Sequence, residues 1–305
     1  MKLNKGWIVA ALIVSVFALS HFAREFIVNQ RGESEHVSEV RESSRIVSMA
    51  PSSCEVLYEI GLGDDVVGVS RFTTYPPEAV GKAKIGGYLD VDIEALVRLQ
   101  PDVVVLLKEQ QTLATQLEGM GMGTVLVDHM SVDGIMNSMR ILGDTFHASE
   151  ASNKARALLE ERISKVEKQA QSEDAKTVLL SIGREFGHGK VNSLVAAGAA
   201  GYHQELLELA NLENAYTGSE NFPQLTREHI LTLDPDVIID MVNSKDAESI
   251  GVEKICADWM AHSELKAVQN GTVYILVGDK HFVPGPRFID TLEWIHATTR
   301  GGNHE

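Results

Sequence analysis

Residues 149–175 read SEASNKARALLEERISKVEKQAQSEDA, and this stretch decides how the rest of the chain is organised. No Gly or Pro interrupts it, and one face carries Lys, Arg, Glu and Gln. On the opposite face, apolar side chains recur at helical spacing at Ala155, Leu158, Leu159, Ile163 and Val166. The stretch therefore predicts one long amphipathic helix, which we assign to residues 148–175.

Two similar blocks of sequence flank this helix. IEALVRLQPDVVVLL (93–107) precedes it and EHILTLDPDVIIDM (228–241) follows it. Aligned without gaps at a constant offset of 134 residues (94 to 228), Glu94 falls on Glu228 and Asp102 on Asp236. A helix, a Pro-Asp pair and a β-branched run thus occur twice. The repeat predicts two similar lobes, residues 44–147 and 176–300, with a cleft between them.

Short apolar strands alternate with helices in both lobes. In the first lobe we expect strands at 45–49, 66–70, 103–107 and 124–127, and helices at 54–60, 93–99, 110–119 and 132–142. In the second lobe we expect strands at 177–182, 237–240 and 273–277, and helices at 202–209, 228–233, 259–268 and 288–298. Near-continuous apolar strands between helices are typical of a parallel sheet covered on both faces. The predicted class is α/β: two lobes, each with a central mostly parallel sheet flanked by helices, joined by one long α-helix.

The composition narrows the function classes. The chain has 305 residues, 27 basic against 43 acidic, for a net charge of −16. A surface this acidic repels phosphate, which disfavours nucleic acid and anionic membranes as partners. Cys54 and Cys256 are the only thiols and fall in different predicted lobes. A disulfide between them would freeze the cleft, so we expect two free thiols.

The N-terminus has the features of an export segment. Lys2 and Lys5 precede an apolar run from Gly6 to Leu19, and small residues follow at positions suited to cleavage. We interpret residues 1–26 as a signal peptide or N-terminal membrane anchor and residues 27–43 as a polar tether. The body is therefore expected in the periplasm, retained at the inner membrane if the segment is not cleaved.

Several segments in order carry a resemblance to a known family. They are IVSMAPSSCEVLYEIGLGDDVVGVS, YPPEA, KIGGYLDVDIEALVRLQPDVVVLL, QELLELANLENAY, QLTREHILTLDPDVII and ELKAVQNGTVYIL, within residues 44–298. Together they resemble the helix-hinged substrate-binding proteins of ABC importers for iron–siderophores, haem and cobalamin. The resemblance implies a receptor, expected to be monomeric, that holds a small-molecule metal chelate between its lobes and docks onto a membrane permease. It also implies that Glu94 and Glu228 match the glutamates that pair with permease arginines, and that the protein has no cofactor of its own.

The candidate ligand site lies in the loops that follow the strands. These loops are 51–53, 70–75, 86–88, 108–110, 184–190, 221–224, 242–245 and 280–287. From them we select as ligand-binding candidates Ser53, Arg71, Phe72, Tyr75, Tyr88, Lys108, Arg184, Phe186, His188, Lys280, His281 and Arg287. A set of cations in an acidic protein favours an anionic ligand such as a ferric siderophore, and the aromatic residues favour a ring-bearing one.

Other ligands and activities stay open. SRFTTYPPEA and Tyr88 resemble cobalamin binders, although Trp259 and Trp294 are expected to be packed on helices. Haem would find axial ligands in Tyr75, Tyr88, His188 or His281. The scattered histidines disfavour a bare zinc or manganese site. No acid/base or nucleophile motif occurs, and residues 183–191 lack the spacing of a phosphate loop, so we predict a non-enzyme. A tethered α/β enzyme or metal-cofactor assembly factor is the alternative outside this class.

Overall fold

The computed structural model describes residues 44–172 and 174–300. The predicted leader (1–26) and tether (27–43) lie outside the described residues. Within the described part of the chain, every helix is too short or too polar to cross a membrane.

The first lobe contains a fully parallel five-stranded sheet in the order β3-β2-β1-β4-β5. Its strands are β1 (Ile46–Ser48), β2 (Val66–Val69), β3 (Ala83–Lys84), β4 (Val103–Leu107) and β5 (Gly123–Val127). Its helices are α2 (Pro51–Glu59), α3 (Pro77–Val80), α4 (Ile93–Leu99), α5 (Gln111–Gly119) and α6 (Val132–Thr145), with single 3-10 turns at Gly63–Asp65 and Lys108–Gln110. The apolar run of β4 is buried in the interior of this sheet, between β1 and β5, which explains its near-continuous apolar sequence.

The second lobe contains a mixed sheet in the order β11-β10-β6-β7-β9, with β8 also paired to β6. Its strands are β6 (Thr177–Arg184), β7 (Ser193–Ala196), β8 (Glu213–Asn214), β9 (Gln224–Thr226), β10 (Val237–Val242) and β11 (Val273–Val277). Its helices are α8 (Tyr202–Leu209), α9 (Arg227–Leu233), α10 (Ser244–Ile250), α11 (Val252–Met260), α12 (Lys266–Gln269) and α13 (Phe288–Thr299), with a 3-10 turn at Asp279–Phe282. Strands β6, β8, β10 and β11 pair in parallel, whereas β7 and β9 are antiparallel additions.

The strand predicted at 177–182 is longer in the structure, and the helix predicted at 259–268 is not continuous. Strand β6 continues to Arg184, and the chain reverses through Gly187 and Gly189, both at positive φ, into the antiparallel strand β7. The predicted boundaries of this helix were wrong, because α11 ends at Met260 and α12 begins only at Lys266. Between them the His262 ring turns back and accepts a hydrogen bond from the Val191 amide.

The repeat seen in the sequence is present in the backbone. Helices α4 and α9 both end on a left-handed residue, Gln100 and Asp234, which are again 134 positions apart (100 to 234). Asp102 accepts a hydrogen bond from the Arg45 amide at 2.8 Å, and Asp236 accepts one from the Thr177 amide at 3.0 Å. Each aspartate therefore ties the start of a central strand to the strand beside it.

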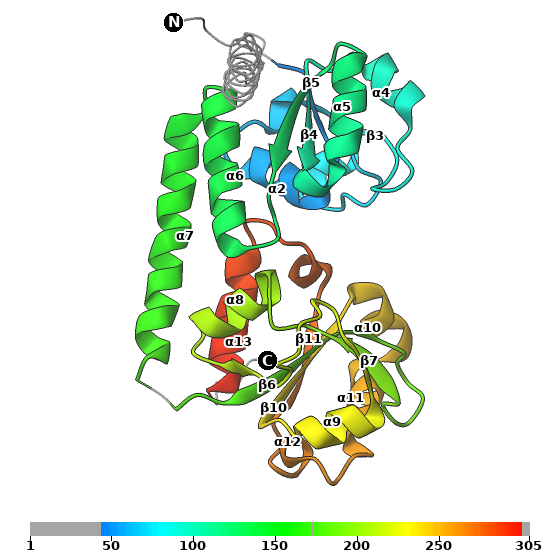
Figure 1. The fold of residues 1–305 in the computed structure, drawn as a ribbon, viewed down its shortest axis with the longest axis vertical. Coiled ribbons are helices and arrows are strands. Elements are labelled where there is room, and N and C mark those ends of the chain that lie inside the picture. The colour runs from blue at the N-terminus through cyan, green and yellow to red at the C-terminus, as the bar shows by residue number, and fades with distance from the viewer. Residues whose placement is uncertain (1–43, 173, 301–305) are drawn as a thin grey trace, which may run out of the picture. The chain divides into compact units, whose positions relative to one another are not determined.

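One long helix, α7 (Ser149–Ala170), joins the lobes. It contacts α6 of the first lobe and α8 and α13 of the second, as Figure 1 shows for α6 and α13. Ala155, Leu159 and Val166 are buried in a core that includes residues of both sheets, but Leu158 is 54% exposed and does not belong to the packed face. Because α7 packs on both lobes along its length, it acts as a stiff connection between them.

Candidate ligand cleft

A cavity of about 260 Å³ borders both lobes at the ends of the strands, and we call it the cleft cavity. His129 and Met130, which follow β5, contribute from the first lobe. The second lobe contributes Ile182, Ala200, Gly201, Tyr202, His203, Asn221, Phe222, Phe282 and Pro284. Ligands of α/β sheets bind beyond the carboxyl ends of strands, so this cavity is the candidate binding site.

Two histidine rings on the cleft cavity each have a nitrogen without a hydrogen-bond partner. The His129 ring is buried, and its Nδ1 lies 2.7 Å from the Ser52 hydroxyl oxygen. Its Nε2 and the Nε2 of His203 are buried with no partner among the residues that the structure describes. Burial lowers the pKa of both rings from 6.5 to about 4, so both are neutral at pH 7. The sequence analysis did not select either residue, although His129 follows directly after a predicted strand.

Aromatic side chains are exposed around the loops that follow the strands. Phe72 and Phe222 are 59% and 56% exposed, and Tyr75, Tyr88 and Phe282 also keep a large part of their surface in solvent. Phe222 was missed as a candidate, although it lies in a loop that the sequence assigned to the cleft. Exposed rings of this kind are available to pack against an apolar ligand.

Each of the five predicted ligand-binding cations has a carboxylate partner. The pairs are Arg71–Asp90, Lys108–Asp128, Arg184 with Asp240 and Asp258, Lys280–Asp290, and Arg287–Glu55. The Arg71 and Lys108 side chains remain 45% and 60% exposed, so solvent screens their pairs and makes them weak. The predicted excess of positive charge at the cleft is therefore largely neutralised by protein carboxylates.

Arg184 is held inside its own lobe. Its side chain is fully buried with Asp240 and Asp258, at 2.8 Å from each carboxylate. The ring of Phe186 stacks on the guanidinium, 4.6 Å from its centroid. The donors of Arg184 thus face protein groups and not the cleft cavity. Burial raises the pKa of Asp240 in spite of this neighbouring cation.

Asp258 also binds the glycine-rich loop that superficially resembled a phosphate site. Its two carboxylate oxygens accept hydrogen bonds from the Gly187 and Gly189 amides, at 2.7 and 2.6 Å. An internal carboxylate therefore occupies the position that an anion would need. His188, on the same loop, points its exposed side chain towards Glu185, with 3.9 Å between the nearest atoms.

Arg287 links the lobes. It donates to both carboxylate oxygens of Glu55 on α2, and its guanidinium lies 3.9 Å from the centroid of the Tyr75 ring. Glu55 is buried, and burial raises the pKa of its carboxyl although Arg287 opposes the shift. This contact connects the loop before α13 to the first lobe, next to Pro284 of the cleft cavity.

Ser53 and His281 are buried in hydrogen bonds within the protein. The Ser53 hydroxyl lies 2.7 Å from that of Ser48, and His281 Nδ1 lies 2.8 Å from the Thr291 hydroxyl. Neither lines the cleft cavity.

Glu94 and Glu228 occupy equivalent places in the two lobes. Each lies in the first turn of its helix, α4 or α9, and each is exposed, with 92% of the Glu94 side chain in solvent. The Glu94 carboxylate lies 4.0 Å from the Arg98 guanidinium in a solvent-exposed i,i+4 pair, which adds little stability. Both glutamates are therefore exposed on the surfaces of their lobes.

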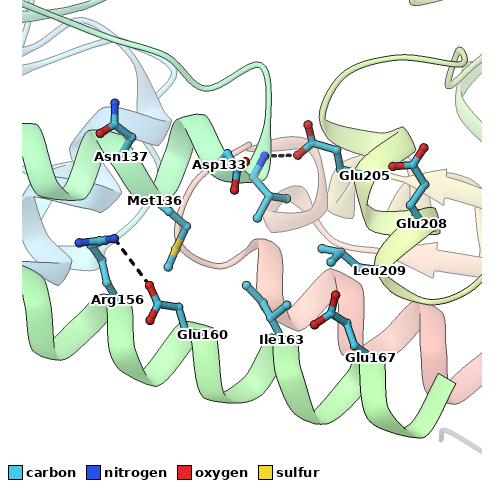
Figure 2. Close-up of a pocket in the computed structure, with 11 residues that line it drawn as sticks. Asp133, Met136, Asn137, Arg156, Glu160, Ile163, Glu167, Glu205, Glu208 and Leu209 are labelled. Atoms are coloured by element: carbon cyan, nitrogen blue, oxygen red, sulfur yellow. Dashed lines mark hydrogen bonds and ion pairs between the residues drawn. The ribbon is translucent and has the colours of Figure 1, made fainter. Parts of the chain in front are cut away.

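A larger hollow of about 850 Å³ lies beside the hinge helix and not at the strand ends. Figure 2 shows that α6, α7 and α8 enclose it, with an Arg156–Glu160 ion pair on its wall. The Val132 amide donates a hydrogen bond to the Glu205 carboxylate there. Its acidic side chains are Asp133, Glu160, Glu167, Glu205 and Glu208. An acidic hollow built from helices alone suits an anionic or ring-bearing chelate less well than the cleft cavity does.

Two α/β lobes with separate sheets, a single connecting helix and a shared cavity at the strand ends define a bilobed solute receptor. A family model described as periplasmic binding protein matches residues 46–279. The chain belongs to this family, in its helix-hinged branch of ABC-importer substrate-binding proteins.

Individual proteins support this assignment. The chain is 27% identical to an uncharacterized ABC transporter substrate-binding lipoprotein of Bacillus subtilis, over 83% of this chain and 79% of that protein. It is 26% identical to a vitamin B12-binding protein of Vibrio cholerae, over 83% and 88% of the two chains. Its fold matches the periplasmic vitamin B12 binding protein BtuF of V. cholerae (TM-score 0.72, 22% identity, 87% and 99% coverage). It also matches S. aureus IsdE complexed with heme (TM-score 0.67, 21% identity, 84% and 98% coverage).

Membership of the family fixes several coarse properties. The protein is a substrate-binding component that works outside the cytoplasm and passes its ligand to an ABC permease, and family membership supports the prediction of a non-enzyme. Such proteins carry a transported ligand and not a resident cofactor. Over the described ranges 44–172 and 174–300, no group of three or more His, Cys, Asp or Glu side chains could hold a metal ion. Cys54 is a buried and Cys256 a partly buried free thiol in this structure.

Proposed function

We propose that this protein captures a metal chelate in the cleft between its lobes and delivers it to a membrane permease, and that the chelate is a corrinoid of the cobalamin type. The observation that carries the proposal is the set of exposed aromatic side chains on the loops that follow the strands, of which Phe222 and Phe282 line the apolar cleft cavity. The cleft cavity alone is smaller than a pocket for a drug-sized molecule, about 300–1,000 Å³. It would therefore receive one part of such a ligand, while the surrounding rings contact the remainder.

The charge arrangement supports a ligand without a large negative charge. The predicted anionic ferric chelate would need donors that are free to bind it, and the candidate cations are paired with carboxylates. A ring-shaped chelate with apolar edges would instead be stabilised by burying its apolar surface against these aromatic side chains. Names of similar proteins mention vitamin B12 and heme, so the choice between ligands depends on the side chains of this chain.

A ferric siderophore is the second candidate, because one observation favours it. Arg71 and Lys108 form exposed, solvent-screened ion pairs. A polyanionic chelate could displace Asp90 and Asp128 at little cost and recruit both cations.

Delivery would use the matched glutamates. Glu94 and Glu228 are exposed at equivalent positions of the two lobes, so fixed cations on a permease could engage both lobes at once. We also propose that residues 1–26 direct export and, if they are not cleaved, hold the body at the inner membrane.

Isothermal titration of the full chain with cyanocobalamin, ferric siderophores and haemin tests the ligand assignment. We expect one-to-one binding of cyanocobalamin with a Kd of about 1 μM or below. Phe222→Ala should weaken this binding roughly tenfold, because it removes an exposed ring on the cleft cavity. Leu158→Ala, at an exposed apolar position on the hinge helix, is the matched control and should leave the Kd unchanged. If ferric siderophores bind and cyanocobalamin does not, a ferric siderophore becomes the preferred ligand. Binding of none of the three compounds would refute the proposal.

A further inference from the structure

The Glu55–Arg287 ion pair crosses from one lobe to the other. Glu55 lies on α2 of the first lobe, and Arg287 directly precedes α13 of the second lobe. The Arg287 Nε donates to one carboxylate oxygen of Glu55 at 3.0 Å, and its Nη2 donates to the other at 2.5 Å. Only 3% of the Glu55 side chain and 23% of the Arg287 side chain are exposed. Such a two-point contact can persist only while the lobes stay together.

The loop that carries Arg287 is fixed to the second lobe. The Lys280 Nζ lies 3.2 Å from the Asp290 carboxylate on α13. The His281 Nδ1 lies 2.8 Å from the Thr291 hydroxyl on the same helix. Helix α13 in turn contacts α7 and α8. If the lobes separate, Arg287 is therefore drawn away from its carboxylate partner and does not follow it.

The contact between this loop and the first lobe is close. A Cβ atom on Gly285 would lie 2.9 Å from Oε2 of Glu55, so the approach requires a residue without a side chain. The Arg287 guanidinium also lies over the Tyr75 ring, 3.9 Å from its centroid. Tyr75 is 42% exposed and is one of the predicted ligand-binding residues. The ion pair therefore covers one face of an aromatic ring that a ligand could use.

The same loop borders the cleft cavity. Phe282 and Pro284 line this cavity, and Pro284 directly precedes Gly285. With the ion pair formed, the cavity measures about 260 Å³, below the range of about 300–1,000 Å³ for pockets that hold drug-sized ligands. A ring-shaped chelate needs a wider opening, so the lobes must separate to admit it. Their separation breaks the ion pair.

An ion pair suits a contact that opens and closes. The desolvation of two buried charges offsets much of their attraction, so the net stabilisation of the closed arrangement is small. Both charges are hydrated again when the lobes separate. An apolar contact would resist opening in proportion to the area that it exposes to water. Two arrangements that are close in free energy are what a ligand needs in order to shift the population between them.

We propose that Glu55 and Arg287 form a latch, which holds the two lobes together across the cleft cavity and must break before a ligand enters. The entry step rests on the proposed function, whereas the contact between the lobes does not. When the latch breaks, the guanidinium leaves the Tyr75 ring and frees that face. Because only molecules with separated lobes take up ligand, the latch lowers the apparent affinity. Weakening the latch therefore strengthens ligand binding, which is the opposite of the loss expected if Arg287 bound the ligand directly.

Pulsed electron paramagnetic resonance with one spin label on each lobe tests the latch without any ligand. Glu109→Cys and Lys245→Cys, at exposed positions that follow β4 and β10, would carry the labels. Cys256→Ser removes the partly buried thiol, and burial raises the pKa of Cys54 to about 12, which leaves that thiol unreactive. We expect Glu55→Gln to raise the ratio of long to short label distances roughly tenfold.

Two further comparisons separate a latch from a general structural role. Glu59→Gln, at an exposed position one turn later on α2, is the matched control and should leave the distances unchanged. Arg287→Gln should lengthen them as Glu55→Gln does. The double variant should be no more open than the more open single variant, because both substitutions remove the same contact. Unchanged distances in Glu55→Gln, or additive opening in the double variant, would overturn the latch.

Stopped-flow binding of cyanocobalamin tests the entry step. Glu55→Gln should raise the association rate constant and lower the Kd, each roughly tenfold, and Glu59→Gln should change neither. Longer label distances without faster association would refute the entry step, and weaker binding in both Glu55→Gln and Arg287→Gln would contradict it as well. If no variant and not the wild type binds cyanocobalamin, the proposed function fails. The label distances still decide in that case whether the ion pair holds the lobes together.

Discussion

Replacing Arg184 by methionine is expected to lower the free energy of unfolding by about 3–5 kcal/mol. The guanidinium is fully buried between Asp240 and Asp258, and its removal would leave two carboxylates without their cation. The Trp259 indole, which donates to Asp240 at 2.9 Å, could stabilise only one of them. Because Asp258 also holds the Gly187 and Gly189 amides, the loop between β6 and β7 should loosen as well.

Chemical denaturation followed by tryptophan fluorescence measures this loss. Arg140→Met is the matched control: Arg140 forms an exposed pair with Asp144 at 2.9 Å, and its replacement should cost at most about 0.5 kcal/mol. A loss below about 1 kcal/mol for Arg184→Met would mean that the cluster does not stabilise the second lobe. Arg184 would then again be a candidate for binding the ligand.

Reversing the charge at both matched glutamates, Glu94→Lys with Glu228→Lys, is expected to abolish uptake of the ligand in cells. Both side chains are exposed in the first turns of α4 and α9, one on each lobe. Cations of a permease at these points would attract the two glutamates but repel two lysines, so docking would be opposed on both lobes. Ligand affinity should not change, since neither residue lines the cleft cavity.

Glu253→Lys provides the control for net charge. Glu253 is also exposed in the first turn of a helix, α11, but has no counterpart in the repeat. Uptake should remain near the wild-type rate in this variant. Undiminished uptake in the double variant would remove the docking role, and a parallel loss of ligand affinity would point to misfolding in place of a docking defect.

The features that the sequence predicted well are local or repeated. The hinge helix follows from the spacing of Ala155, Leu159 and Val166, and the paired lobes follow from the 134-residue offset. The structure adds that Asp102 and Asp236 make the same strand-to-strand hydrogen bond, which gives a physical reason for the repeated Pro-Asp pair. The near-continuous apolar strands predicted a mostly parallel sheet in each lobe, and the first sheet is fully parallel.

The features that were missed depend on contacts between distant residues. Glu55 and Arg287 are 232 positions apart, and no local pattern indicates that they pair. Asp240 and Asp258 likewise lie far from Arg184 in the sequence, so its burial could not be read from its loop position. The strands β7 and β9 are too short to give a clear periodicity. A lone histidine such as His129 carries no motif, and only the fold brings it to a cavity with His203.

The central claim is that both lobes close on one ligand at the cleft cavity, and hydrogen exchange measured with and without cyanocobalamin tests it most directly. The account predicts slower exchange at 128–131 in the first lobe and at 200–203, 221–222 and 281–284 in the second. Protection confined to one lobe, or centred on the acidic hollow at 156–167 and 205–209, would contradict it.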